Sequence, residues 1–334
     1  MDMKVGIKRI LFMKEIRITD IENICIGQYE NEEAATGCTV LISKEGMAAG
    51  LDVRGGGPAS RESELLKPVA NAKFIHSIVL SGGSSYGLGV ADGVMRYLEE
   101  QDIGLDVAIC KVPLVCQSDL FDLTVGRYDI RPDASYGYEA AKIALNGGNY
   151  KDGNYGAGCG ASVGKWRGMD TCMKSGIGSY AVEVGDVKVG ALVAVNSLGD
   201  IYDYKTGQKV AGLLKPDKSG FDDTLKWMLK NTEVVENKFT GNTTIGVIIT
   251  NAGFDKTSLC KIASMTHNGY ARSIKPVHTS ADGDSIYAVS TGSIPADQDL
   301  VGTLAADVMS EAILRAVRSA KSAYGFMGAG DIKW

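Results

Sequence analysis

Five short apolar runs, bounded by glycine or polar residues, constrain the fold of this 334-residue chain most strongly. They are expected to be buried strands, at 38–43, 75–80, 189–196, 245–250 and 285–290. Other segments have apolar residues at helical spacing and predict helices at 86–101, 136–147, 222–230, 256–274 and 299–323. Strands follow one another in some places and helices intervene in others. This order favours helical layers packed on sheets over a regular βαβ alternation.

The composition narrows the class of protein and its partners. The formal net charge is -5 and no basic block occurs, so nucleic acid is not expected as a partner. No apolar run approaches the roughly 20 residues that span a bilayer, so no membrane partner is expected. Residues 1–20 lack the long apolar segment of a secretory signal. A cytoplasmic protein is therefore expected.

Cysteine and histidine usage argues against a disulfide framework and against a metal site. The 7 cysteines include no Cys-x-x-Cys pair, and the chain has only 3 histidines. No metal or cofactor is predicted. The 42 glycines outnumber the 7 prolines, and clusters of glycine lie at 54–57, 81–87 and 156–165. These clusters are expected to let backbone approach backbone and to expose N–H groups toward a small cleft.

The tetrapeptide Gly241-Asn242-Thr243-Thr244 stands directly before the apolar run at 245–250. It places a hydroxyl at the start of a buried strand, behind a flexible Gly-Asn step, which suits a chain that cuts its own backbone. Cleavage between Asn242 and Thr243 would give Thr243 a free α-amine, and an α-amine with a pKa of about 7.7–8.0 is a suitable base for the hydroxyl. The alternative is an ordinary strand start after a turn. Thr244 is the second candidate nucleophile.

The segment upstream of this bond, 214–240, is the best candidate for a linker. It is rich in Lys, Asp, Asn and Thr around one short predicted helix. A mobile, solvated segment would let a new terminus swing free, although a plain surface excursion has the same composition.

Four polar side chains elsewhere are candidates for a network around the amine. Lys165 ends the third glycine cluster, which is not a phosphate loop because Trp166 stands where Ser or Thr is needed. Asn196 closes an apolar run and would be either a turn cap or a donor in an oxyanion hole. Asp282 and Asp284 can share one face and orient an ammonium group, although Asx-rich turns have the same pattern.

Short motifs in a fixed order are similar to those of one known family along nearly the whole chain. They are Leu51-Asp52-Val53-Arg54-Gly55-Gly56, Leu80-Ser81-Gly82-Gly83-Ser84, Ala91-Asp92-Gly93-Val94, Phe121-Asp122-Leu123, Arg131-Pro132-Asp133, Gly156-Ala157-Gly158, Gly164-Lys165, Val195-Asn196, Asn242-Thr243-Thr244-Ile245-Gly246-Val247, Arg272-Ser273-Ile274-Lys275-Pro276-Val277-His278-Thr279 and Asp282-Gly283-Asp284. By these motifs the chain resembles the self-cleaving L-aminopeptidase/D-esterase group, which includes β-peptidyl aminopeptidases and nylon-oligomer endo-hydrolases.

The resemblance implies a fold, a processing event and an activity. The implied fold is a four-layer αββα sandwich, similar to N-terminal-nucleophile hydrolases but with different connectivity. One domain over residues 1–334 would be cut into an α chain, 1–242, and a β chain, 243–334, and the αβ units would assemble into a homo-oligomer, often a tetramer. The enzyme would be an aminopeptidase or amidase that cleaves small peptide, amide or ester substrates through an acyl-enzyme. The resemblance assigns the nucleophile and its polar network to Thr243, Lys165, Asn196, Asp282 and Asp284.

Some positions depart from the family pattern, and two other functions remain open. Cys159 stands where many relatives have threonine, and Cys116-Gln117-Ser118-Asp119 stands where many have small apolar residues. Both departures are expected near the substrate pocket. Phe121 lies where some members carry tyrosine. The alternatives are acyl transfer to an amine, as in the ornithine acetyltransferases, and non-catalytic binding of a small molecule.

Overall fold

A computed structural model describes residues 13–230 and 241–332, and the long strand β3 (Thr36–Val53) organises its sheets. The first half of β3 pairs with β2 (Cys25–Asn31) and β5 (Ile75–Ser81), and the second half pairs with β17 (Ser285–Ile294). The register shifts between the two halves, where Gly46 has a φ of 83° that favours glycine. One strand therefore belongs to two sheets.

Further strands extend each sheet away from β3. The first sheet continues from β5 through β8 (Val115–Asp119) to β4 (Ala59–Arg61). The second continues from β17 through β15 (Thr243–Ala252), β12 (Val187–Asn196) and β11 (Ile177–Val184) to β1 (Met13–Ile16). Because β15 is parallel to β17 and antiparallel to β12, the starts of β15 and β17 meet the end of β12 at one edge. Shorter strands are β6 (Leu105–Asp106), β7 (Lys111–Val112), β9 (Ser162–Val163), β10 (Met173–Lys174), β13 (Asp200–Tyr202), β14 (Lys209–Ala211) and β16 (Ile274–Lys275).

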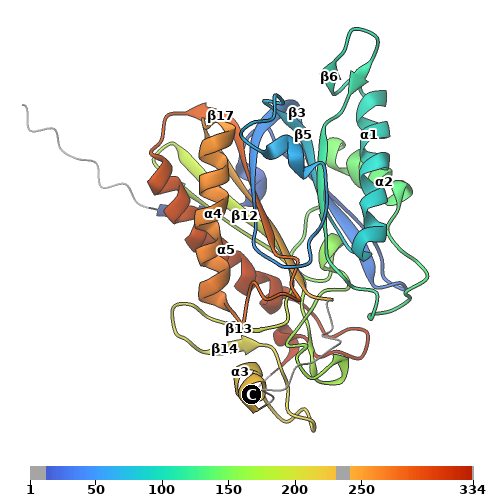
Figure 1. The fold of residues 1–334 in the computed structure, drawn as a ribbon, viewed down its shortest axis with the longest axis vertical. Coiled ribbons are helices and arrows are strands. Elements are labelled where there is room, and N and C mark those ends of the chain that lie inside the picture. Colours follow the sequence, from blue (N-terminus) through green and yellow to red (C-terminus); the bar gives the residue numbers. More distant parts are fainter. Residues whose placement is uncertain (1–12, 231–240, 333–334) are drawn as a thin grey trace, which may run out of the picture.

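Helices cover the outer faces of both sheets (Figure 1). They are α1 (Val90–Glu100), α2 (Ala134–Leu145), α4 (Lys256–Ser273) and α5 (Gln298–Ser319). The short helix α3 (Thr224–Lys230) lies apart from these faces and begins beside β13, where the Thr224 N–H donates to Asp200 Oδ2. The pair α1 and α2 packs on the first sheet, and the pair α4 and α5 packs on the second. Within residues 13–230 and 241–332, no helix combines the length and the apolar character that crossing a bilayer requires.

Alternation along the strands sorts apolar side chains into separate cores. Val247 of β15 packs between the two sheets, whereas its neighbour Ile248 packs against α4 and α5. In β3, Leu41 packs between the sheets, whereas Val40 and Ile42 pack against α1 and α2. Three cores therefore separate four layers in the order helices, sheet, sheet, helices. The predicted αββα sandwich is confirmed.

The predicted elements are all present, with shifted ends. The helix predicted at 299–323 ends at Ser319, and the helix predicted at 86–101 begins as a 3₁₀ turn at Ser84–Gly89 before α1. The candidate linker is anchored in its first part, because the buried Thr224 donates its N–H to Asp200 Oδ2 at 3.0 Å. Residues 231–240 of that linker lie outside the described residues.

Candidate active site

Thr243 is the first residue of β15, at the edge where three strand ends meet. Its antiparallel partner on β12 is Asn196, and β17 runs parallel on the other side. The residue is 4% exposed, and the alternation of β15 directs its side chain into the space between the sheets. Thr243 Oγ1 lies 2.5 Å from the carbonyl oxygen of Asn242 and donates to it. The hydroxyl thus contacts the peptide group that is predicted to break.

The Asn242 carbonyl oxygen receives a second donor from the loop before β17. The N–H of Gly283 donates to it at 2.9 Å. A Cβ built on Gly283 would lie 2.8 Å from Thr243 Oγ1 and 2.8 Å from the carbonyl oxygen of Gly57, closer than a Cβ atom approaches other heavy atoms in proteins. Only glycine therefore lets this segment approach the hydroxyl. The sequence reasoning missed this residue, since a backbone donor carries no side-chain signature.

Thr244, the second candidate nucleophile, faces the opposite side of β15. Its N–H donates to Asp284 Oδ1 at 2.7 Å, and its carbonyl accepts from the Tyr270 hydroxyl at 3.3 Å. Thr244 is fully buried beneath α4, which carries Tyr270. The contacts of Thr244 hold the start of β15 in place.

Lys165 contacts Asn196 and Gly241, the residue before Asn242. Its Nζ donates to the carbonyl oxygen of Asn196, to Asn196 Oδ1 and to the carbonyl oxygen of Gly241, each at 2.9 Å. The residue is 3% exposed. Burial lowers the pKa of the Lys165 ammonium to about 7, since the charged form loses its hydration. The lysine side chain predicted for the network is therefore next to the proposed cut.

The lowered pKa of Lys165 predicts how stability depends on pH. Between the folded value of about 7 and the ordinary value of 10.5, the unfolded chain keeps a proton that the folded chain has lost. The free energy of unfolding should therefore rise with pH across this window, relative to Lys165→Met, by at most about 1.4 kcal/mol per pH unit. Below the window both states hold the proton and the difference is constant.

Urea unfolding of the two chains from about pH 6 to pH 9 measures this difference. Both chains should carry Thr243→Ala, so that cleavage at residue 243 does not alter the comparison. Parallel stability curves across the window would contradict the lowered pKa.

Asn196 connects β12 to the chain on both sides of the site. Its Oδ1 accepts from the Ser162 N–H at 3.0 Å as well as from Lys165. Its Nδ2 donates to the carbonyl oxygens of Phe121, at 2.8 Å, and Gly241, at 3.3 Å. Asn196 therefore fixes the residue that precedes the proposed cut pair. Its role as a donor to an oxyanion stays a prediction.

Asp282 and Asp284 lie in the loop between β16 and β17. Asp282 Oδ2 accepts from the Thr279 N–H at 2.9 Å and from the Thr279 hydroxyl at 2.5 Å. Burial, and next the nearby Asp284 carboxylate, raise the pKa of the Asp282 carboxyl. Asp284 Oδ1 accepts from the Thr244 N–H, so this carboxylate is one residue from the nitrogen of Thr243. The chain thus brings both predicted carboxylates to the start of β15.

The first glycine cluster holds the loop that carries these carboxylates. The N–H groups of Arg54 and Gly55 donate to the Asp284 carbonyl oxygen at 3.0 and 3.1 Å, and that of Gly57 donates to the Asp282 carbonyl oxygen at 2.9 Å. A Cβ on Gly55 would lie 2.2 Å from the Asp284 nitrogen. The prediction that this cluster lets backbone approach backbone is confirmed.

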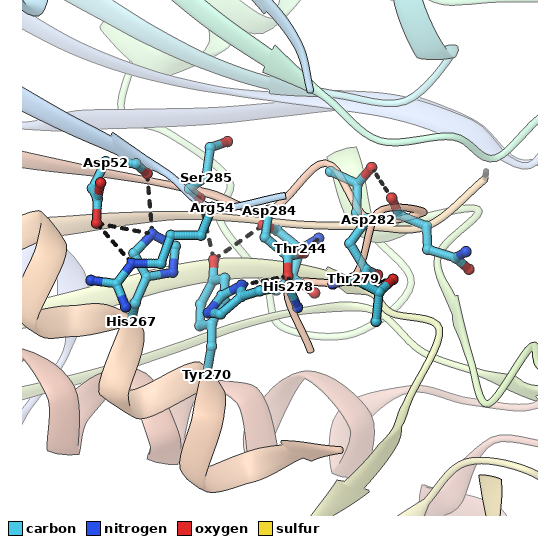
Figure 2. Close-up of polar contacts among 12 residues, drawn as sticks. Asp52, Arg54, Thr244, His267, Tyr270, His278, Thr279, Asp282, Asp284 and Ser285 are labelled. Atoms are coloured by element: carbon cyan, nitrogen blue, oxygen red, sulfur yellow. Dashed lines mark hydrogen bonds and ion pairs between the residues drawn. The ribbon is translucent and has the colours of Figure 1, made fainter. Parts of the chain in front are cut away.

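Two histidines and a tyrosine lie behind Asp284 and were missed as site residues (Figure 2). His278 Nδ1 lies 2.9 Å from Asp284 Oδ2, and the His278 N–H donates to the same oxygen at 3.1 Å. His267 and Tyr270 of α4 pack against the His278 ring. His278 belongs to one of the motifs shared with the family, at 272–279, but nothing in the sequence indicates that it lies beside Asp284.

The positions that depart from the family pattern lie in different surroundings. The Ser118 hydroxyl of β8 is 2.8 Å from the Tyr287 hydroxyl and 3.2 Å from Ser285 Oγ, so it joins the two sheets beside the start of β17. Tyr287 thereby brings an aromatic hydroxyl into the space between the sheets. Cys159 is buried with its Sγ 3.4 Å from the Tyr324 hydroxyl. The expectation that Cys159 and the segment 116–119 lie near the substrate pocket stays a prediction.

Sequence comparison identifies related proteins over most of the chain. The model of peptidase family S58 matches residues 17–330. An uncharacterized aminopeptidase of Mycobacterium leprae is 34% identical over 339 residues, with 92% of this chain and 91% of that protein covered. A 6-aminohexanoate-oligomer endohydrolase of Agromyces sp. is 30% identical over 323 residues, with 91% of this chain and 86% of that protein covered.

Solved structures share the fold. A beta-aminopeptidase of Burkholderia sp. superposes with a TM-score of 0.65 at 19% identity, covering 96% of this chain and 93% of that one. The L-aminopeptidase D-Ala-esterase/amidase of Ochrobactrum anthropi superposes with a TM-score of 0.61 at 17% identity, covering 91% and 86%, and is described as a variant of the Ntn hydrolase fold. With the family match over nearly its whole length, this chain belongs to peptidase family S58 and is a hydrolase.

Proposed function

We propose that the chain cuts itself between Asn242 and Thr243, and that Thr243 is then the nucleophile of an aminopeptidase or amidase. One observation carries this proposal: the Thr243 hydroxyl is 2.5 Å from the Asn242 carbonyl oxygen, which also accepts the Gly283 N–H at 2.9 Å. A hydroxyl next to a carbonyl that a fixed donor polarises supports acyl transfer from that carbonyl to the hydroxyl. Membership of a peptidase family supports amide-bond chemistry.

Self-cleavage would proceed through an ester. The Thr243 oxygen attacks the Asn242 carbonyl carbon, and the Gly283 N–H donates to the oxyanion that forms. The bond from carbon to the Thr243 nitrogen breaks, and this nitrogen gains the proton that the Thr243 hydroxyl loses, so that it becomes an amine. Water then hydrolyses the ester, which leaves a carboxylate on Asn242 and restores the Thr243 hydroxyl.

The mature enzyme would repeat these steps on a substrate. The Thr243 amine takes the hydroxyl proton while the oxygen attacks the substrate carbonyl carbon. The carbon–nitrogen bond breaks, the leaving amine carries the proton away, and the acyl group remains on Thr243 as an ester. Water hydrolyses this ester and returns the free enzyme. The substrate oxyanion would occupy the position of the Asn242 carbonyl oxygen, next to the Gly283 N–H.

The polar network would hold the new amine and set its affinity for protons. Asp284 accepts from the neighbouring Thr244 N–H, and the buried Asp282 lies in the same loop, so both carboxylates would attract the ammonium form. Lys165 reaches the carbonyl oxygen of Gly241, two residues before the amine, and would oppose its protonation when charged. Asn196 would keep the lysine in place.

We propose small amides, peptides or esters with a free amine as the substrates, acted on by a homo-oligomer of αβ units. The aminopeptidase and 6-aminohexanoate-oligomer endohydrolase names of the relatives support this class. These names do not distinguish four substrate classes, which are α-peptides, β-peptides, D-amino esters and ω-amino-acid oligomers. Light scattering behind size exclusion would test for the tetramer.

A substrate panel tests the proposed hydrolysis. Purified protein incubated with one member of each class should release the free acid from at least one, together with the amine of an amide or the alcohol of an ester. Thr243→Ala should release none of these products. A competing amine acceptor should not divert most of the acyl group. If the acyl group passes mainly to that acceptor, the enzyme is an acyltransferase of the ornithine acetyltransferase type, and if no class is cleaved, the proposed function is wrong.

A further inference from the structure

The side chain of His278 contacts the Asp284 carboxylate (Figure 2). Its Nδ1 lies 2.9 Å from Asp284 Oδ2, and the side chain of Asp284 is 1% exposed while that of His278 is 17% exposed. A carboxylate can only accept a hydrogen bond, so Nδ1 carries the proton and donates it. The opposite oxygen, Oδ1, accepts the Thr244 N–H at 2.7 Å. One carboxylate therefore links the imidazole to the backbone beside Thr243.

Aromatic packing fixes the imidazole in this orientation. The His278 ring is stacked on Tyr270 with centroids 5.9 Å apart, and its centroid is 4.7 Å from that of His267 in an edge-on arrangement. Both partners come from α4 and are fully buried. The Tyr270 hydroxyl also donates to the carbonyl oxygens of Thr244 and Ser285, at 3.3 and 3.4 Å. The same helix thus braces the ring and the starts of β15 and β17.

The backbone of His278 adopts a left-handed conformation. Its φ is 58°, in the left-handed region, where asparagine, aspartate and histidine are enriched among the non-glycine residues. This conformation costs free energy. This conformation lets both the N–H and the ring Nδ1 of His278 reach Asp284 Oδ2. Within the described residues Nε2 is buried and has no hydrogen-bond partner, so Nδ1 makes the polar contact of the ring.

We propose that His278 is a positioning residue that holds the Asp284 carboxylate for self-cleavage and for hydrolysis. This inference rests on the proposed function of Thr243. With Oδ2 held by two donors from His278, rotation of the carboxylate is blocked and Oδ1 stays directed at the start of β15. After cleavage, that orientation presents Asp284 to the Thr243 amine. Without the imidazole, Oδ2 keeps one longer contact and the carboxylate can turn away.

Two substitutions test the role of the His278 Nδ1–H donor without changing the left-handed backbone. Asparagine and glycine both tolerate the left-handed backbone, and asparagine places an N–H donor where histidine has Nδ1. His278→Gly should slow self-cleavage and lower kcat, each by about 10- to 100-fold, as expected for the loss of one hydrogen bond to a charged group. KM should change little. His278→Asn should restore both rates to within about threefold of wild type.

Cell-free synthesis followed by denaturing electrophoresis gives the half-time of self-cleavage without any substrate. The kcat and KM of the processed enzymes are then measured on one substrate, the amino acid p-nitroanilide that the wild-type enzyme cleaves fastest. His76→Asn is the matched control, because this histidine lies on β5, where its Nδ1 accepts the Leu114 N–H at 3.1 Å. It should leave both rates unchanged.

Each outcome decides the role of His278. A glycine variant within twofold of wild type, or an asparagine variant as slow as the glycine variant, overturns it. If the glycine variant does not fold, the asparagine variant decides alone, since a folded His278→Asn slowed tenfold or more contradicts the donor role. Thr243→Ala runs in parallel, and if that chain is still cut, the proposed function fails whatever His278 does. If Thr243→Ala stays intact and His278→Gly matches wild type, only the role of His278 is lost.

Discussion

Thr243→Ala should leave the chain in one piece and reduce hydrolysis by about 10⁵- to 10⁶-fold, to the background rate. The substitution removes the oxygen that contacts the Asn242 carbonyl, and with it both the self-cleavage step and the acyl-enzyme. Because no cut occurs, no amine forms to act as the base. Denaturing electrophoresis and an assay with the best substrate measure the two effects.

Two neighbouring substitutions control for changes in folding. Thr243→Ser keeps the hydroxyl and should be cut and active. Thr244→Ala removes the adjacent threonine hydroxyl, whose oxygen has no hydrogen-bond partner within the described residues, and should also be cut and active. If Thr243→Ala is still cut, or if Thr244→Ala is the variant that is neither cut nor active, then the nucleophile is Thr244.

Gly283→Ala should slow self-cleavage by about 100-fold or more, which is the scale of effect that a displacement of about 1 Å has on reacting groups. The added methyl group would lie 2.8 Å from Thr243 Oγ1 and 2.8 Å from the Gly57 carbonyl oxygen, so either the hydroxyl or the loop must move. Either movement separates the hydroxyl from the carbonyl, or the Gly283 N–H from its acceptor. The half-time of the full-length chain measures the effect.

Gly57→Ala is the matched control for this glycine. Within the described residues, a Cβ at Gly57 would meet only the Asp282 carbonyl oxygen, at the ordinary contact distance of 3.9 Å, and its N–H would still donate to that oxygen. Processing should therefore proceed at the wild-type rate. Normal processing of Gly283→Ala would show that the close backbone approach is not needed.

The sequence predicts the fold best where strands are rich in valine and isoleucine. The runs at 189–196 and 245–250 carry that signal, and they form β12 and β15. The second half of β3 was not predicted, because Ala48, Ala49 and Gly50 have little apolar surface. Their small size has a reason in the packing, since a Cβ on Gly50 would lie 2.3 Å from the backbone nitrogen of Cys260 in α4. A strand that lies this close to a helix loses its apolar pattern.

The candidate site could be predicted only where side chains carry the chemistry. Lys165, Asn196, Asp282 and Asp284 are candidates from their places in the sequence, and the family resemblance assigns them to the network. The topology brings them to the start of β15 beside Thr243. The contacts that could not be foreseen depend on backbone geometry. The Gly283 N–H reaches its acceptor through a loop approach, and the position of His278 depends on a left-handed backbone and on packing against α4.

The most direct test of self-cleavage is the N-terminal sequence of the smaller fragment of the purified active protein, together with the intact mass of both fragments. The fragment should begin Thr-Thr-Ile-Gly, at residue 243, and the masses should equal those of residues 243–334 and of the remainder of the chain that ends at Asn242. A fully active protein that consists of one uncut chain, or a fragment that begins at any other residue, would contradict the proposal.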